Sequence, residues 1–168
     1  MASFIDRVIR AAKLDPNLYE EVEADKTAMG QAMGVVVLSG VAAGIGAMGV
    51  HGSAGIAPGA IGALIGWFVW AGLTYLIGTK LLPEPQTRSD LGELLRTIGF
   101  SSSPGLIRVL GIVPILGGIV FLVASIWMLI AMVIAVRQAL DYTRTGRAVL
   151  VCFIGWITQV LILLVLLR

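Results

Sequence analysis

Long apolar stretches alternate with short polar ones along most of the chain, and this pattern decides the fold class. The apolar stretches cover about residues 28–50, 58–78, 91–113, 115–136 and 148–167. About 20 consecutive apolar residues in a helix cross the hydrocarbon core of a bilayer. The pattern therefore predicts an all-α, polytopic integral membrane bundle of five transmembrane helices over residues 28–168. Residues 1–27 form a cytoplasmic tail that is amphipathic at first and then acidic.

The third apolar stretch, residues 91–113, is the one whose crossing is ambiguous. It contains Arg96 and Arg108, and the run SSSPG at residues 101–105 interrupts it. An arginine at the centre of a spanning helix costs about 2.5–3.5 kcal/mol on insertion scales, but both arginines lie towards the ends and can extend to opposite interfaces. A broken backbone is tolerated at membrane depth where neighbouring helices or a wet cavity satisfy its polar groups. We therefore expect a kinked or broken third spanning helix, with a re-entrant or interfacial hairpin as the alternative.

The distribution of Lys and Arg favours five crossings, because short cytoplasmic loops carry an excess of these residues. Five spans with a cytoplasmic N-terminus leave Arg108 and Arg168 outside and place on the inner side Arg7, Arg10, Lys13, Lys26, Lys80, Arg88, Arg96, Arg137, Arg144 and Arg147. Four spans would move the three arginines of the 137–147 loop to the outer side, which the rule disfavours. The C-terminus is then expected outside.

The tail carries two short helical patterns. Residues 3–13 place five apolar residues on one helical face and put on the other Asp6, Arg7, Arg10 and Lys13. This pattern fits an interfacial helix whose basic residues face anionic lipid, or equally a tail helix packed on the domain. Asp15 and Pro16 then start a second helix as N-cap and first-turn residue. Its acidic residues are expected to form a solvated face rather than a docking site for a partner: Glu20, Glu21, Glu23 and Asp25.

Small residues mark the first apolar helix as one that packs closely against another helix. Gly30 and Gly34 are four residues apart, as are Gly40 and Gly44. Lipid tails give helices no hydrophobic drive to associate, so close backbone approach through small side chains is the available means. The pattern leaves open whether the partner helix belongs to this chain or to another copy.

Four tryptophans lie near the middle of apolar helices, whereas indole rings are most common at membrane interfaces. They are Trp67, Trp70, Trp127 and Trp156. A buried indole N–H needs an acceptor, which we expect to come from Thr74, Ser125, Thr158 or Gln159. The rings are predicted to fill space opposite the small residues of the first helix. The alternative is a pocket for an acyl chain, a quinone or a pigment.

Composition narrows the chemistry. The chain of 168 residues is 58% hydrophobic and 13% charged, against about a quarter charged in soluble domains. A net charge of +2 without a basic stripe argues against nucleic-acid binding. One cysteine and one histidine exclude the usual metal clusters, and the absence of carboxylates from the apolar cores disfavours ion-coupled transport. We therefore expect no enzyme, no catalytic residue, no metal and no cofactor.

Two parts of the C-terminal half carry a family resemblance. Residues 90–114 read DLGELLRTIGFSSSPGLIRVLGIVP, and residues 137–159 read RQALDYTRTGRAVLVCFIGWITQ. These parts resemble the Yip family of five-span membrane proteins. The matching elements are Gly99-Phe100-Ser101 with Pro104, and Thr145-Gly146-Arg147-Ala148 leading to Gly155-Trp156. The stretch LYEEVEADKTAMGQA ahead of the first span is similar to prokaryotic members of that family.

The resemblance implies a role without catalysis. Eukaryotic Yip proteins interact with Rab GTPases and act in vesicle traffic. Their Asp-Leu-Tyr-Gly-Pro motif is not reproduced at Asp90-Leu91-Gly92, which puts a GTPase partner in doubt. The short tail and loops are similar to those of a prokaryotic member, which implies the plasma (inner) membrane of a prokaryote.

We therefore predict a non-enzymatic scaffold or accessory subunit that engages bilayer lipid, other membrane proteins or a second copy of itself. Candidate interaction residues are, on the cytoplasmic side, Asp90, Arg96, Arg137, Arg144 and Arg147, and at the break Gly99, Ser101, Pro104 and Gly105. Topology and helix capping alone would explain the same residues. The alternative function is a small channel, or a carrier of lipid or a small molecule, built around the broken third helix.

Overall fold

The computed structural model describes residues 3–113 and 115–166, and in that part of the chain every regular element is a helix. Four helical segments are long and apolar enough to cross a membrane, namely Lys26–Gly46, Ser53–Leu81, Gly117–Ala139 and Thr145–Ile162. The predicted all-α membrane fold is confirmed at that level. Pro114, Leu167 and Arg168, which the sequence analysis placed at the ends of spans, lie outside the described residues.

In chain order the elements are α1 (Phe4–Ala12), α2 (Pro16–Ala24), η1 (Lys26–Ala28), α3 (Met29–Gly46), α4 (Met48–His51), η2 (Ser53–Gly55), α5 (Ile56–Leu76), η3 (Ile77–Leu81), α6 (Leu91–Phe100), η4 (Ser103–Ile112), α7 (Gly117–Ala139) and α8 (Thr145–Leu166). The elements marked η are 3₁₀ helices, except that η3 is a π-helical continuation of α5.

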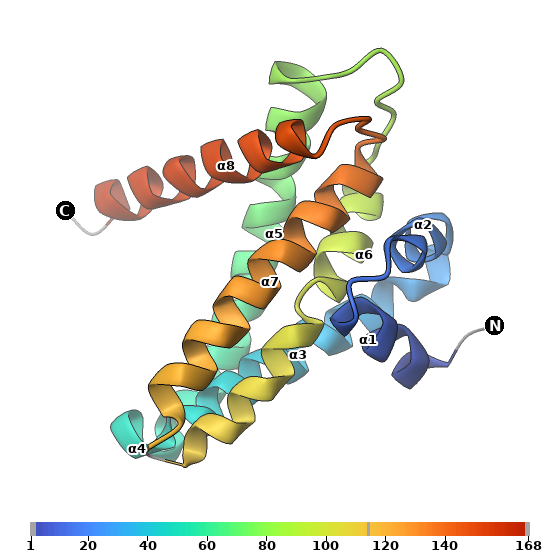
Figure 1. The fold of residues 1–168 in the computed structure, drawn as a ribbon. Coiled ribbons are helices and arrows are strands. Elements are labelled where there is room, and N and C mark those ends of the chain that lie inside the picture. The colour runs from blue at the N-terminus through green and yellow to red at the C-terminus, as the bar shows by residue number, and fades with distance from the viewer. Residues whose placement is uncertain (1–2, 114, 167–168) are drawn as a thin grey trace.

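Helices α3 and α5 form an antiparallel pair that small residues bring into close contact (Figure 1). A Cβ atom at Gly40 would lie 2.9 Å from the Cα atom of Ala60, and a Cβ atom at Gly44 would lie 2.7 Å from the Cα atom of Ile56. These two glycines therefore let the backbones touch. The partner helix that the sequence left open is, for this pair of glycines, in the same chain.

The other two glycines of that pattern have different surroundings. A Cβ atom at Gly30 would meet nothing within 4 Å. A Cβ atom at Gly34 would lie 3.9 Å from the ring of Phe4, which belongs to α1. The close approach of α3 to α5 is therefore made at Gly40 and Gly44 and not at the two earlier glycines.

The third apolar stretch is built from two pieces, α6 and η4, with a turn at Ser101 and Ser102 between them. Both pieces pack against α3 and α7. Pro104, near the start of η4, has no N–H to extend the ladder of α6. Each piece has ten residues, and these rise about 15 Å in the α-helix and about 20 Å in the 3₁₀ helix. A fifth crossing through this stretch stays a prediction.

Helix α8 is attached to the bundle over its first part only. It packs against α7, α5 and η3, and a Cβ atom at Gly155 would lie 3.4 Å from the indole ring of Trp70. From Val160 to Val165 the side chains that the structure describes are all exposed. Figure 1 shows this end of α8 projecting away from the other helices.

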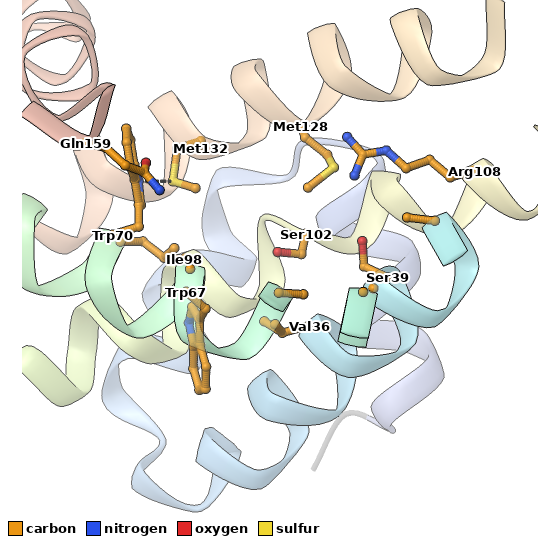
Figure 2. A pocket seen from close by; sticks show the side chains of 15 residues that line it. Val36, Ser39, Trp67, Trp70, Ile98, Ser102, Arg108, Met128, Met132 and Gln159 are labelled. Atoms are coloured by element: carbon orange, nitrogen blue, oxygen red, sulfur yellow. Dashed lines mark hydrogen bonds between the residues drawn. The ribbon is translucent and has the colours of Figure 1, made fainter. Parts of the chain in front are cut away.

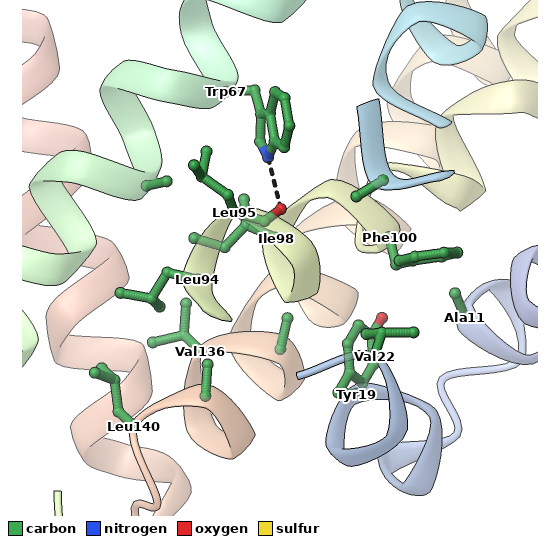
Figure 3. Packing of buried hydrophobic residues seen from close by; sticks show 14 of the residues in the cluster. Ala11, Tyr19, Val22, Trp67, Leu94, Leu95, Ile98, Phe100, Val136 and Leu140 are labelled. Atoms are coloured by element: carbon green, nitrogen blue, oxygen red, sulfur yellow. Dashed lines mark hydrogen bonds between the residues drawn. The ribbon is translucent and has the colours of Figure 1, made fainter. Parts of the chain in front are cut away.

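Helices α1 and α2 form an N-terminal hairpin on one side of the bundle (Figure 1). The carboxylate of Asp15 caps α2 by accepting a hydrogen bond from the Asn17 N–H at 3.0 Å, and Pro16 is the first helical residue. Both features were predicted. Helix α2 packs against α6 and α7, and the hydrophobic core at this junction includes Tyr19 and Phe100 (Figure 3).

Candidate functional site

The polar end of the bundle gathers the N-terminal hairpin, the start of α6 and the loop between α7 and α8. Asp90 and Glu93 begin α6 as a reciprocal capping box: the Glu93 N–H donates to the Asp90 carboxylate at 2.8 Å, and the Asp90 N–H donates to the Glu93 carboxylate at 2.9 Å. The sequence allows this cap, because Glu93 lies three residues after Asp90. The cap also accounts for Asp90 structurally, because two N–H groups at the helix start are satisfied.

Arg96 is buried between α6 and α2, with 5% of its surface exposed. Its Nε donates to the carbonyl of Val22 at 2.9 Å, and its Nη2 donates to the carbonyl of Glu23. Both carbonyls belong to the last turn of α2, where no intrahelical donor is available. A cation there also complements the negative end of the helix dipole. Arg96 therefore fastens the N-terminal hairpin to the bundle.

The basic residues of α1 face α2 and not lipid, which corrects one of the two readings of the tail. Arg7 is 4% exposed, and its guanidinium lies 2.9 Å from the Glu21 carboxylate and 2.7 Å from the Asp25 carboxylate. Arg10 lies 2.6 Å from Glu21 and 2.9 Å from Asp15. The expectation of a solvated acidic face on α2 is wrong for Glu21 and Asp25, because α1 covers them.

These ion pairs lower the pKa values of the carboxylates. The hydrogen bond from Arg10, and then that from Arg7, hold the pKa of Glu21 below its ordinary value. Hydrogen bonds from Thr27 and then from Arg7 lower the pKa of Asp25 to about 2. The network is therefore fully charged at neutral pH.

Glu23 is an acid that the sequence gave no reason to single out. One of its carboxylate oxygens is buried and has no hydrogen-bond partner within the described chain. Burial, and then repulsion from Glu20, Glu93 and Asp141, raise the pKa of Glu23 to about 8, against a smaller opposing effect of Arg96. At neutral pH this carboxyl group is therefore mostly protonated.

The last turn of α7 and the loop that follows it hold two of the predicted arginines. Arg137, in the last turn of α7, donates across the loop to the carbonyl of Tyr142 and to the hydroxyl of Thr145, both at 3.3 Å. Arg144 lies exposed at the surface of the same loop. Arg137 therefore acts as a brace for the turn, while Arg144 remains accessible to a partner.

Arg147 connects α8 to the segment that follows α5. Its Nε lies 3.2 Å from the Glu84 carboxylate, and its Nη1 donates to the carbonyl of Pro83 at 2.8 Å. The nearby hydroxyl of Tyr142 lies 3.1 Å from the carbonyl of Gly78 and 2.7 Å from that of Leu82. These contacts hold the start of α8 against the end of α5.

The residues of the break pack against α3. A Cβ atom at Gly99 would lie 2.7 Å from the Cβ atom of Ala32, and a Cβ atom at Gly105 would overlap the hydroxyl of Ser39. The hydroxyl of Ser101 donates to the carbonyl of Ile98 at 2.7 Å, which satisfies a buried acceptor of α6. Pro104 is buried beside them. The break therefore serves close packing within the chain.

An inner cavity of about 370 Å³ lies among α3, α5, η4, α7 and α8 (Figure 2). Its wall is largely apolar, with aromatic rings from Trp67 and Trp70 and thioethers from Met128 and Met132. Polar atoms enter it from Ser39, Ser102, Arg108 and Gln159. Gly40, Gly59 and Gly66 also line it along α3 and α5.

Three indole N–H groups have acceptors that the sequence analysis did not name. Trp67 donates to the carbonyl of Leu95 at 2.9 Å, Trp70 to the sulfur of Met132 at 3.2 Å, and Trp127 to the carbonyl of Ala12 at 2.8 Å. The expected acceptors Thr74, Ser125, Thr158 and Gln159 are not used in these three bonds. Since the acceptors are backbone carbonyls and a thioether, their positions depend on the fold and not on a sequence signal.

Arg108 reaches into the inner cavity from η4. Its Nη2 donates to the hydroxyl of Ser125 at 3.2 Å, and its guanidinium carbon lies 5.7 Å from the ring centre of Phe121. Its Nε is buried and has no hydrogen-bond partner among the described residues. The cation is therefore partly desolvated beside an aromatic ring.

A second, apolar space lies between α7 and α8. This α7–α8 cleft has a volume of about 590 Å³ and is lined by Trp70, Leu129, Ile130, Val133, Ile134, Thr145, Val149, Cys152, Phe153 and Trp156. Phe153 and Trp156 are more than half exposed. Trp156 therefore belongs to this outer surface, Trp67 lines the inner cavity, and Trp70 lines both spaces.

Within the described chain, no three His, Cys, Asp or Glu side chains lie together in a way that could hold a metal ion. The model of the family described as Yip1 domain matches residues 21–167 of the chain. The match covers most of the sequence, so the chain belongs to the Yip1 domain family, whose members are in general non-enzymatic membrane proteins. Comparison with curated proteins and with solved structures gives no significant match.

Proposed function

Taking this chain as a member of the Yip1 domain family, we propose that it is a non-enzymatic membrane scaffold that binds another membrane protein, or a second copy of itself, through α8. The observation that carries the proposal is the geometry of α8. From Val160 to Val165 the side chains that the structure describes are all exposed, and this end of α8 projects beyond the bundle. The apolar α7–α8 cleft opens beside the first half of the helix.

The cleft suits a transmembrane helix as its occupant. Its wall is formed by side chains of α7 and α8 together with Trp70 of α5. Phe153 and Trp156 offer large apolar surfaces with few rotamers to immobilise. Association in lipid depends on van der Waals packing, because lipid tails compete equally for apolar surface. A partner helix that fills the cleft would gain packing contacts on two sides, which lipid tails fill less completely.

The proposed topology has five crossings with a cytoplasmic N-terminus in a prokaryotic plasma membrane. The α6–η4 segment packs along α3 and α7, and its combined rise of about 35 Å is sufficient for a hydrocarbon core of about 30 Å. Contacts between distant segments support the grouping of the charged loops on one side: Gln138 donates to Glu20 at 2.7 Å, and Gln86 donates to the Asp141 carbonyl at 3.0 Å.

The inner cavity favours a second candidate function, a carrier of lipid or a small molecule. Its position beside the broken third stretch fits such a role. A carrier would move its substrate between leaflets of liposomes that contain the purified protein alone. A scaffold would show no such movement and would retain a bound membrane protein.

Site-specific photo-crosslinking in cells tests the scaffold. A photoreactive phenylalanine analogue at Phe153 or Trp156 is expected to give one defined cross-linked protein band. The matched control carries the analogue at Phe68, which is exposed on α5 and does not line the cleft. Native mass measurement after gentle detergent extraction then separates a foreign partner from a second copy. Only lipid adducts at all three positions, together with a monomeric mass, would refute the scaffold.

A further inference from the structure

Arg108 has no carboxylate partner among the residues that the structure describes. The elements lining the inner cavity are α3, α5, α6, η4, α7 and α8, and of these only α6 contains an acidic residue, Glu93 at its far end. Glu93 is engaged in the capping box with Asp90. The ring of Phe121 and the hydroxyl of Ser125 are weak substitutes for an anion. An ionisable residue at membrane depth is costly and usually marks a functional site.

The inner cavity leads away from this cation along the bundle. Figure 2 shows Arg108 at one end, Ser39 and Ser102 in the middle, and Trp70, Met132 and Gln159 at the other end. Along α5, the residues that line the cavity run from Gly59 to Trp70, eleven residues later, which is about 16 Å of helix. That distance is close to half of a hydrocarbon core about 30 Å thick. The cavity therefore has the length of one leaflet.

We propose that the inner cavity binds an anionic lipid, with the head group on Arg108 and one acyl chain extended towards Trp67 and Trp70. The head group supplies the negative charge that the protein lacks, through a charge-assisted hydrogen bond to the buried Nε. The hydroxyls of Ser39 and Ser102 lie where the ester carbonyls of a phospholipid would follow its phosphate. The rings and thioethers beyond them form a wall suited to methylene groups.

Phosphate and carboxylate head groups share this chemistry, so both sources are compared. The two serines favour a phospholipid, because a free fatty acid has no ester carbonyl beyond its carboxylate. The inference concerns the inner cavity and does not depend on the α7–α8 cleft. The lipid measurement can therefore fail while the scaffold proposal stands, and the reverse also holds.

Tryptophan quenching by brominated lipids measures occupancy directly. In a Trp127→Phe, Trp156→Phe background the remaining indoles are Trp67 and Trp70, which both line the cavity. The protein in detergent is titrated with phosphatidylglycerol carrying a dibrominated acyl chain, with phosphatidylcholine carrying the same chain, and with dibromostearic acid. We expect half-maximal quenching by phosphatidylglycerol at a mole fraction about tenfold below that for phosphatidylcholine.

Two pairs of variants separate charge from space. Arg108→Gln should abolish the preference for the anionic lipid, whereas Arg108→Lys should keep most of it. Gly66→Leu should fill the cavity and reduce quenching by every lipid, because Gly66 lines it and a Cβ atom there meets nothing within 4 Å. Gly72→Leu, on the same helix with the same free space but outside the lining, is the matched control.

Each outcome of the quenching experiment either overturns or establishes the proposed lipid site. Equal quenching by phosphatidylglycerol and phosphatidylcholine, unchanged in Arg108→Gln, would overturn the proposal, as would equal behaviour of Gly66→Leu and Gly72→Leu. Stronger quenching by dibromostearic acid than by phosphatidylglycerol would assign the site to a fatty acid and overturn the phospholipid assignment. Preferential quenching by phosphatidylglycerol that is lost in Arg108→Gln and Gly66→Leu would establish it.

Discussion

Replacing Arg96 by methionine tests whether two backbone hydrogen bonds hold the N-terminal hairpin to the bundle. Methionine keeps most of the length and apolar volume of arginine and removes every donor. In the structure the guanidinium donates to the carbonyls of Val22 and Glu23. The variant therefore leaves two acceptors at the end of α2 without their partners, while the surrounding packing is largely preserved.

The size of the effect follows from the bonds that are lost. A hydrogen bond to a charged group contributes about 1.5–3 kcal/mol. Glu23 is only half-buried, so water can reach this helix end once it loosens, and the lower bound applies to each bond. The expected loss is about 3 kcal/mol for the pair, which corresponds to a factor of about 150 in the equilibrium between docked and undocked hairpin.

Hydrogen–deuterium exchange measures this equilibrium segment by segment. The amides of α2 around Leu18, Tyr19 and Val22 are buried against α6 and α7. Their exchange should accelerate by about two orders of magnitude in Arg96→Met, with α3 and α5 unchanged. Arg88→Met is the control, because Arg88 is exposed in the preceding polar loop. Identical protection of α2 in Arg96→Met and the parent protein would refute a fastening role and leave Arg96 as a determinant of topology alone.

Two further predictions concern Glu23 of α2 and the contact of Gly99 in α6 with Ala32 in α3. The folded-state pKa of Glu23, about 8, lies above its ordinary value of 4.5, so protonation of Glu23 favours the docked hairpin. The stabilisation of the docked hairpin by protonated Glu23 is complete below about pH 4.5 and is lost as pH rises through 8. Protease cleavage of α2 should therefore be faster at pH 9 than at pH 6, and Glu23→Gln should remove that difference; a difference that survives would contradict the assignment. Gly99→Ala should lower the free energy of unfolding by about 1–3 kcal/mol, since the new Cβ atom would meet Ala32 at 2.7 Å. Gly62→Ala has open space at its Cβ atom and should unfold like the parent; equal denaturation midpoints for both variants would show that the α3–α6 contact yields easily.

The features that could be predicted are those that short segments determine. The capping box of Asp90 and Glu93 and the cap of α2 at Asp15 require only residues within one turn. Gly40 and Gly44 predicted a close helix contact, and the structure then supplied α5 of the same chain as the partner that the pattern had left open. Apolar length alone predicted the all-helical membrane class.

The features that could not be predicted depend on how segments turn relative to one another. Arg7 and Arg10 meet the acids of α2 only because Leu14, with a φ of 63°, reverses the chain after α1. The left-handed backbone is uncommon for leucine, so no residue preference announces the reversal. The acceptors of Trp67 and Trp127 are carbonyls of distant segments. The partial docking of α8 likewise has no local sequence signal.

The two arginines of the third apolar stretch illustrate how burial of the same residue type can serve different ends. The buried donors of Arg96 meet backbone carbonyls, so removing its side chain must disturb structure first. The Nε of Arg108 has no such partner in the described part of the chain, and its guanidinium reaches into the inner cavity. A cation that served only to fix topology would be stabilised better by extending to the interface. Arg108 instead turns towards α7 and lines the cavity. For this reason we seek its anionic partner among the lipids of the bilayer.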